Sequence, residues 1–227
     1  MLKEADHIIA VSQAVMLYAH KLGVPTSRVS VVENSVDLRG YEGTKPRTNA
    51  NGVVRVAFVG RLIKNKGPQY LVEAAPAILR ESPNVEFLIV GDGPMVYELR
   101  ERLAQLGILD HFRFLGYRPH FLTRCDILVR PSLTEGMPLT VMEAMACGVP
   151  TVASDVGGTR EILCHGETGY LIESKNVEQL GRYVSKLAND PVLRTQMGQR
   201  AKANSETRPS WRDVALRTTK IYESVVS

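Results

Sequence analysis

The chain has 227 residues, of which 44% are hydrophobic, and without an internal repeat this length predicts one large domain, or one domain with appendages, around a substantial core. Its net charge of +4 and sequence pI near 9.0 suit anionic ligands or lipid headgroups, but the scattered Lys and Arg residues and few aromatics disfavour a nucleic-acid interface. No stretch approaches the roughly 18 uncharged apolar residues of a membrane span, and the N-terminus lacks the layout of a signal peptide.

Short apolar runs rich in Val, Ile and Phe alternate with helical patterns along the whole chain. This alternation predicts an α/β fold whose parallel sheet is covered on both faces. The predicted strands cover residues 7–11, 29–33, 53–59, 85–90, 112–115, 127–130, 151–153 and 170–172. The predicted helices lie near residues 13–21, 67–80, 94–106, 139–147, 176–189, 191–204 and 211–225.

One segment interrupts the pattern and predicts a linker at residues 37–52, because it is rich in Gly, Asn and Thr and has no apolar periodicity. Residues 1–36 hold about one strand-helix-strand piece, which is too small for a core of its own. Residues 53–205 form a unit of the size of a nucleotide-binding domain. Pro209 then introduces a C-terminal helix within residues 206–227.

The first candidate site follows the strand at 53–59, which ends at Gly60 and is succeeded by Arg61, Lys66 and a helix. Ligands of open α/β sheets bind beyond the carboxyl ends of the strands, where a helix N-terminus favours an anion. Arg61 offers a planar fork of donors and Lys66 a mobile point charge, which together suit a diphosphate. The alternative is that both are ordinary solvated loop cations.

The segment VGDGPMVYEL at 90–99 begins like a dinucleotide fingerprint, with Gly91 and Gly93. Val96 occupies the place of the third Gly, and Pro94 suits the start of a helix, so a tight strand-to-helix turn is favoured and a dehydrogenase is disfavoured. No GxxxxGK[ST] motif occurs, which disfavours a P-loop nucleotidase.

The segment TEGMPLTVMEAMACG at 134–148 predicts a short helix of about nine residues, begun by Pro138 and ended by Gly148. Its first turn presents free backbone N–H groups from about Met137 to Val141, which would hold phosphate oxygens. Gly136, just before it, would allow a ligand to approach the backbone closely.

Glu143 lies one turn inside this nearly apolar helix, and its side chain leans back toward the N-terminus. A buried carboxylate requires a partner, but the positions four residues away are Leu139 and Cys147. A pair of ribose hydroxyls would satisfy it. The alternative is a structural hydrogen bond to a distant group.

The three cysteines, Cys125, Cys147 and Cys164, are widely spaced and form no CxxC pair. Neither a disulfide framework nor a zinc site is therefore expected, and all three are predicted to be small buried side chains.

The segments VGRLIKNKG, VGDGP and TEGMPLTVMEAMACGVPTVASDVGGTREI resemble, in this order, the donor-binding domain of the retaining family 4 glycosyltransferases. The last segment contains the paired-glutamate motif of that family, Glu135 and Glu143 with seven residues between them. The similarity covers nearly the whole chain. It implies the C-terminal half of a GT-B fold, which is a Rossmann-like parallel sheet with helices on both faces.

The resemblance also implies a role for each matching residue. Arg61 and Lys66 would grip the donor diphosphate and stabilise the leaving group, beyond the strand end at Gly60. Glu143 would hold the ribose and Glu135 would lie beside the sugar, so that Arg61, Lys66 and Glu135 are the expected catalytic residues. The remaining expected contacts are mainly backbone groups of Gly136, Met137, Pro138, Leu139 and Thr140 at the sugar and phosphate, and of Tyr117 and Arg118 at the nucleobase.

No metal or other cofactor is expected, because the resemblance implies a metal-independent transferase with a UDP- or GDP-linked sugar as substrate, and the chain contains no DxD pair. Members of the family begin with a second Rossmann-like domain that binds the acceptor, a sugar or a lipid-linked glycan. Residues 5–37 resemble only its final segment, with Ser35 in place of the usual Gly. The C-terminal helix resembles the one that packs back across that domain.

The chain is accordingly expected to be a fragment or truncated form with little or no transferase activity alone. Its exposed faces would allow two copies to associate. The alternatives are a non-catalytic nucleotide-sugar-binding subunit that serves a partner, and a sugar-nucleotide epimerase or phosphorylase of the same fold. A cytoplasmic location is the default, with a peripheral position at the inner membrane face if the acceptor is lipid-linked.

Overall fold

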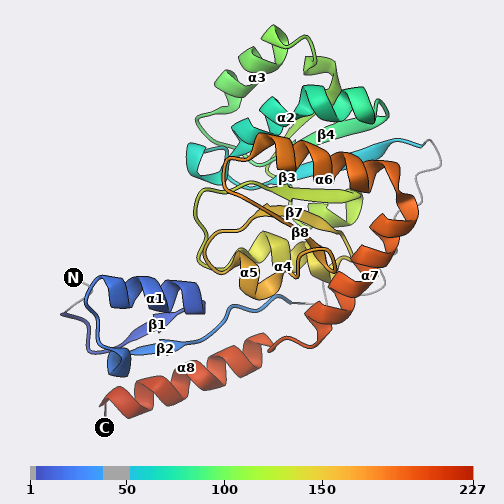
Figure 1. Ribbon diagram of the computed structural model, residues 1–227. Coiled ribbons are helices and arrows are strands. Elements are labelled where there is room, and N and C mark those ends of the chain that lie inside the picture. Colours follow the sequence, from blue (N-terminus) through green and yellow to red (C-terminus); the bar gives the residue numbers. More distant parts are fainter. Residues whose placement is uncertain (1–3, 38–51, 227) are drawn as a thin grey trace.

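The computed structural model describes residues 4–37 and 52–226, so almost all of the linker predicted at 37–52 lies outside the described residues. The large unit is built on a six-stranded parallel sheet with the strand order β5-β4-β3-β6-β7-β8 (Figure 1). The strands are β3 (Val54–Val59), β4 (Val85–Val90), β5 (Phe112–Gly116), β6 (Ile127–Arg130), β7 (Thr151–Ser154) and β8 (Gly169–Ile172). The chain proceeds outward from β3 to β5 and then returns to β6, so the strand order reverses between β3 and β6.

Helices cover both faces of this sheet, as the α/β pattern of the sequence predicts (Figure 1). Successive residues of β3 point to opposite faces, so Phe58 is buried in one hydrophobic core and Ala57 in the other. One face carries α2 (Pro68–Glu81), α3 (Val96–Gln105) and α6 (Val177–Asn189), and the other carries α4 (Leu139–Ala146) and α5 (Thr159–Ile162). Helix α7 (Pro191–Glu206) packs against both α4 and α6.

A smaller unit precedes the large one and consists of β1 (Ile8–Ala10), α1 (Gln13–Lys21) and β2 (Val29–Val31), whose strands pair in parallel. Its own buried cluster has only four members, Ala10, Ala19, Val24 and Val29. The last helix, α8 (Trp211–Val226), returns to the side of β2 (Figure 1). Ser35 is buried there, and its hydroxyl donates to the Pro209 carbonyl at 2.7 Å, which ties the chain after β2 to the start of α8.

The strands and longer helices begin and end within two residues of their predicted positions, but the sequence analysis missed several short elements. These are α5 and the 3-10 turns at Thr26–Arg28, Lys64–Lys66, Leu109–His111 and Phe121–Arg124, which are too short for an apolar period. The prediction that every cysteine is buried was wrong for Cys164, which is exposed. Among the described residues, no helix has the length and apolar character needed to cross a membrane.

Candidate functional site

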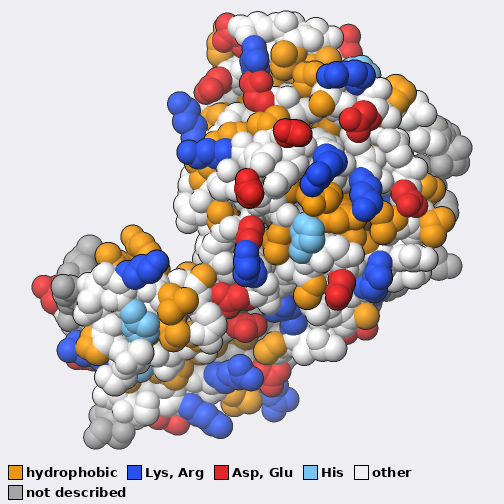
Figure 2. Space-filling view, in the orientation of Figure 1, with side chains coloured by type: hydrophobic (Ala, Val, Ile, Leu, Met, Phe, Trp, Pro, Cys, Tyr) orange, Lys and Arg blue, Asp and Glu red, His pale blue; other side chains and the backbone are white. Residues whose placement is uncertain are grey.

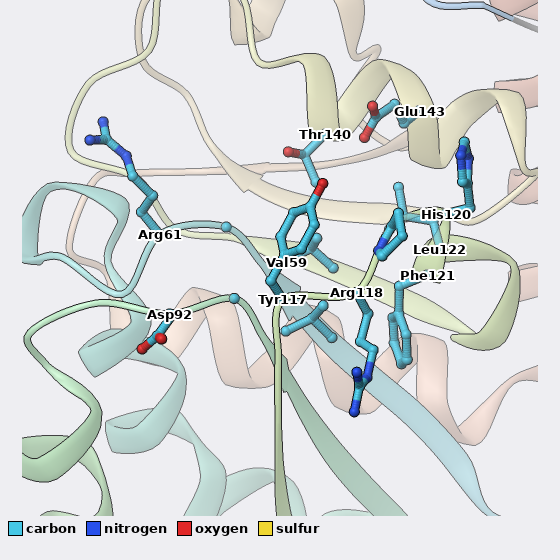
Figure 3. Close-up of a pocket in the computed structure, with 14 residues that line it drawn as sticks. Val59, Arg61, Asp92, Tyr117, Arg118, His120, Phe121, Leu122, Thr140 and Glu143 are labelled. Atoms are coloured by element: carbon cyan, nitrogen blue, oxygen red, sulfur yellow. The ribbon is translucent and has the colours of Figure 1, made fainter.

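A cavity of about 430 Å³ opens beyond the carboxyl ends of β3, β4 and β5 (Figure 3). Three loops that follow these strands form most of it, and helix α4 supplies Thr140 and Glu143. Its lining consists of residues 59–61, 90–92 and 117–122 together with those two side chains. The cavity therefore lies where open α/β sheets place their ligands.

Two glycines let the strand ends approach closely enough to form the floor of this cavity. The Gly60 amide donates to the Val90 carbonyl at 2.9 Å, and a Cβ added to Gly91 would lie 2.0 Å from the Gly60 carbonyl oxygen. Gly91 also has a φ of +130°, which other residues rarely adopt. The glycines of VGDG thus serve backbone packing, whereas a Cβ on Gly60 of VGR would meet the Arg130 side chain.

Six of the twelve predicted donor-binding residues line the cavity, namely Gly60, Arg61, Tyr117, Arg118, Thr140 and Glu143. In Figure 3, Arg61 and Glu143 come from opposite sides of the cavity, with Tyr117 and Thr140 between them, whereas the Arg118 guanidinium extends away from Glu143. The Arg61 side chain is exposed and has no hydrogen-bond or ion-pair partner within residues 4–37 and 52–226. It is therefore available to an anionic ligand.

Glu143 presents a half-buried carboxylate to the cavity (Figure 3). Across the part of the chain that the structure describes, nothing forms a hydrogen bond or ion pair with it. Burial raises the pKa of the Glu143 carboxyl above its ordinary value, while the nearby His120 acts in the opposite direction. A ligand that donates hydrogen bonds would satisfy this carboxylate.

Glu135, in contrast, is hydrogen-bonded to three side chains beside the cavity and does not line it. Its Oε1 accepts from Arg130 Nε at 2.8 Å and Ser132 Oγ at 2.7 Å, and its Oε2 accepts from Lys66 Nζ at 2.9 Å. Burial alone would raise the pKa of Glu135, but the charges of Arg130 and Lys66, with these hydrogen bonds, hold it below its ordinary value. Glu135 is thus an ionised carboxylate held by cations.

The loop that precedes α4 contacts the N-terminal unit. Ser12 Oγ donates to the Gly136 carbonyl at 2.8 Å, and a Cβ added to Gly136 would lie 3.1 Å from the Val11 side chain. Gly136 thus packs against Val11 on the side where a Cβ would lie, and its role in close ligand approach stays a prediction. Met137 is buried in the same loop.

The predicted row of free amides at this helix end is also shorter than expected. Val141 N–H donates to the Pro138 carbonyl at 3.0 Å, and Pro138 itself has no N–H. Leu139 and Thr140 are the first two residues of the helix, and Pro138 at the N-cap position supplies no side-chain hydrogen bond to their amides. An oxygen ligand would complete this uncapped end.

The sequence analysis missed several residues of this region. Asp92 and His120 line the cavity, and His120 has a φ of +51°, unusual for a residue other than Gly. Arg130 ends the otherwise apolar strand β6, and this buried charge was a signal that could have been followed. Among the residues described, no three His, Cys, Asp or Glu side chains gather as a metal site would require.

The sequence matches the family model described as Glycosyl transferases group 1 over residues 45–204. The chain belongs to this family. The matched residues include the whole lining of the cavity, so the cavity belongs to the part of the chain that the family model describes.

Curated relatives include the glycogen synthase of Mycobacterium tuberculosis, 28% identical over 98% of this chain and 55% of that protein. The UDP-Gal:alpha-D-GlcNAc-diphosphoundecaprenol alpha-1,3-galactosyltransferase of Escherichia coli is 31% identical over 76% of this chain and 48% of that protein. The chain spans between a fifth and just over half of the length of the curated relatives it matches.

Among solved structures, Anabaena HepE in complex with UDP and glucose superimposes with a TM-score of 0.83 and 26% identity, over 98% of this chain and 63% of that one. The C-terminal domain of the group 1 protein LpcC from Francisella tularensis has a TM-score of 0.68 and 26% identity, over 77% of this chain and 98% of that one. These neighbours confirm the α/β, Rossmann-like arrangement of a GT-B glycosyltransferase.

Proposed function

We propose that this chain binds a UDP- or GDP-linked sugar as the donor-binding half of a retaining, metal-independent glycosyltransferase. The observation that carries the proposal is the composition of the cavity. It combines the carboxylate of Glu143 and the guanidinium of Arg61, neither of which has a hydrogen-bond or ion-pair partner among the described residues, with the uncapped end of α4. A ribose, a diphosphate and a sugar together supply the complementary groups.

In this proposal Glu143 accepts hydrogen bonds from the two ribose hydroxyls, and the nucleobase lies along the 117–122 loop. Arg61 and Lys66 bind the diphosphate and stabilise the charge that develops as the glycosidic bond breaks. The acceptor hydroxyl attacks on the face that the diphosphate leaves, and its proton passes to the departing diphosphate oxygen. Glu135 is ionised and tied to cations, so its role is to hold Lys66 and to offer Oε2 to a sugar hydroxyl, and not to donate a proton.

UDP is favoured over GDP as the first candidate, because three structures of one relative at 26% identity, Anabaena HepE, contain UDP, UDP-glucose, or UDP with glucose. The acceptor is proposed to bind to a further domain or a partner subunit. In the relatives this chain corresponds to part of a longer protein.

Calorimetric titration with UDP, GDP, ADP and NAD in buffer containing EDTA tests the proposal. UDP or GDP is expected to bind with the chelator present, and NAD is not. Tight NAD binding with no response to any nucleoside diphosphate would overturn it. Transfer that appears after co-expression with a partner would favour the alternative of a donor-binding subunit.

A further inference from the structure

Arg130 is a charged residue at the end of β6 with a side chain only 7% exposed. Each of its three guanidinium nitrogens has a partner. Nη1 donates to the Val59 carbonyl at 2.8 Å, while Nε and Nη2 lie 2.8 and 2.7 Å from the same oxygen of Glu135, Oε1. Burying a guanidinium is costly unless it is paired, so a specific arrangement holds it here.

The pairing joins Arg130 to the proposed diphosphate site through Glu135. Lys66 Nζ lies 2.9 Å from the other carboxylate oxygen, Oε2. The Lys66 side chain is 17% exposed, against 7% for both Arg130 and Glu135, so the lysine is the member of the group nearest to solvent. Glu135 therefore lies between two cations, and Lys66 is the more exposed of the two.

The Glu135 carboxylate is unfavourable for an anion-binding site at Lys66. A carboxylate at 2.9 Å from Lys66 would cancel much of the lysine's attraction for a diphosphate, and Glu135 would itself repel the phosphates. Arg130 supplies a second positive charge on the far side of Glu135. Two cations and one carboxylate leave the group with a net charge of +1.

We propose that Arg130 is a positioning residue that compensates the charge of Glu135, so that Lys66 keeps its attraction for the donor diphosphate. The inference deepens the proposed function and rests on it. Ser132 assists, because its hydroxyl donates to the same Oε1 at 2.7 Å and leaves Oε2 to Lys66.

Gly60 supports this position of the guanidinium. A Cβ on Gly60 would lie 2.4 Å from Arg130 Nη1, so the glycine provides the room that the guanidinium occupies beneath the loop carrying Arg61. Arg130 therefore lies next to Gly60, which precedes the proposed phosphate-binding residue Arg61, and it acts through Glu135 on the second such residue, Lys66.

Four proteins test the inference by titration with inorganic pyrophosphate, which lacks the ribose and sugar. Counting Arg130, Glu135 and Lys66, the wild type has a charge of +1, Arg130→Gln has 0, Glu135→Gln has +2, and the double variant has +1. Each unit of charge is expected to change the affinity by about tenfold. Glu135→Gln should bind tightest, the wild type and the double variant about equally, and Arg130→Gln weakest.

Recovery of affinity in the double variant is the result that a merely structural role would not give. Arg194→Gln is the matched control, because Arg194 is also partly buried and donates to the carbonyls of Leu187 and Ala188, away from the cavity. It is expected to lower the melting temperature without changing pyrophosphate affinity.

If Arg130→Gln alone does not fold, the double variant is compared with Glu135→Gln, since neither contains an uncompensated carboxylate. The double variant should then bind about tenfold more weakly. Equal affinities in that pair, wild-type affinity in folded Arg130→Gln, or a double variant no better than Arg130→Gln would each overturn the inference. If the wild type still binds UDP in those cases, the proposed function stands and only the role of Arg130 is wrong. If the wild type binds neither UDP nor pyrophosphate, both the proposed function and the role of Arg130 are wrong.

Discussion

Glu135 and Glu143 flank the start of α4 but have opposite surroundings. Glu135 accepts hydrogen bonds from Arg130, Ser132 and Lys66, and its pKa is lowered despite its burial. Glu143 faces the cavity without a hydrogen-bond partner among the described residues, and burial raises its pKa. The first carboxylate is therefore part of the protein's internal charge balance, and the second is open to a ligand.

This difference predicts a selective effect of Glu143→Ala. UDP affinity should fall by roughly 10- to 150-fold, because a hydrogen bond to a charged group contributes roughly 1.5–3 kcal/mol. Pyrophosphate affinity should stay within about twofold, since that ligand has no ribose. Calorimetry with both ligands measures the contrast, and Glu101→Ala, on the exposed face of α3, serves as the control. Equal weakening of both ligands would mean that another group faces the ribose.

The raised pKa of Glu143 also predicts a pH-dependent effect on stability. The native state holds this proton more tightly than the unfolded state, so its contribution is present at low pH and is lost as the pH rises through the native pKa. Glu143→Gln is neutral at every pH. It should raise the melting temperature at pH 7 by roughly 1–3 °C, with no difference below about pH 4. A variant less stable than the wild type at pH 7 would contradict this origin of the shift.

Arg61→Ala should separate binding from stability. The side chain is exposed and without a partner in the described parts of the chain, so the melting temperature is expected to stay within about 1 °C. UDP and pyrophosphate should both bind about tenfold more weakly, because the guanidinium is proposed to contact phosphate. Arg80→Ala, at the exposed end of α2, tests whether any lost arginine has the same effect.

The sequence was most informative where the relevant signal is local. Apolar periods placed the strands and long helices, and the contrast between Glu143 and its apolar neighbours identified a carboxylate that needs a partner. The same kind of contrast exists at Arg130 and was not used, because a charge at the end of a strand also suits a solvated position.

The other omissions depend on which segments meet in space. Asp92 and His120 reach one cavity because β3, β4 and β5 are neighbours in the sheet, and this strand order is not a property of any local pattern. The contacts of Ser12 with Gly136, and of Glu161 with α1, join residues more than a hundred positions apart. Contacts between residues so far apart leave no local pattern in a single sequence, so they could not be predicted from it.

Gly91→Ala tests the close approach of strand ends beneath the cavity. The new Cβ would lie 2.0 Å from the Gly60 carbonyl oxygen, so the backbone must shift in addition to adopting an unfavourable φ. We expect a loss of about 2–4 kcal/mol in the free energy of unfolding. Gly107→Ala is the control, since Gly107 has a φ of +69° and open space around it, and should cost only about 1–2 kcal/mol. Denaturant titration measures the free energy of unfolding of both variants. Similar losses in the two would show that the contact with Gly60 does not determine the cost of Gly91→Ala.

Glu161 is expected to fasten the N-terminal unit to the large unit. Its two carboxylate oxygens accept from the amides of Gln13 and Ala14, both at 2.9 Å, at the positive end of α1. Glu161→Ala removes a charged cap worth about 1–2 kcal/mol, while the α1 N-cap bond from the Val15 amide to Ser12 remains.

The expected result is faster amide hydrogen exchange in β1, α1 and β2, with little change in β3 to β8, because the small unit's own hydrophobic cluster has only four buried members among the described residues. Pyrophosphate binding should persist, since Arg61 and Lys66 belong to the large unit. Glu101→Ala again provides the exposed control. Unchanged protection in α1, or an equal loss of protection across the six-stranded sheet, would contradict a cap that acts on the attachment of the N-terminal unit.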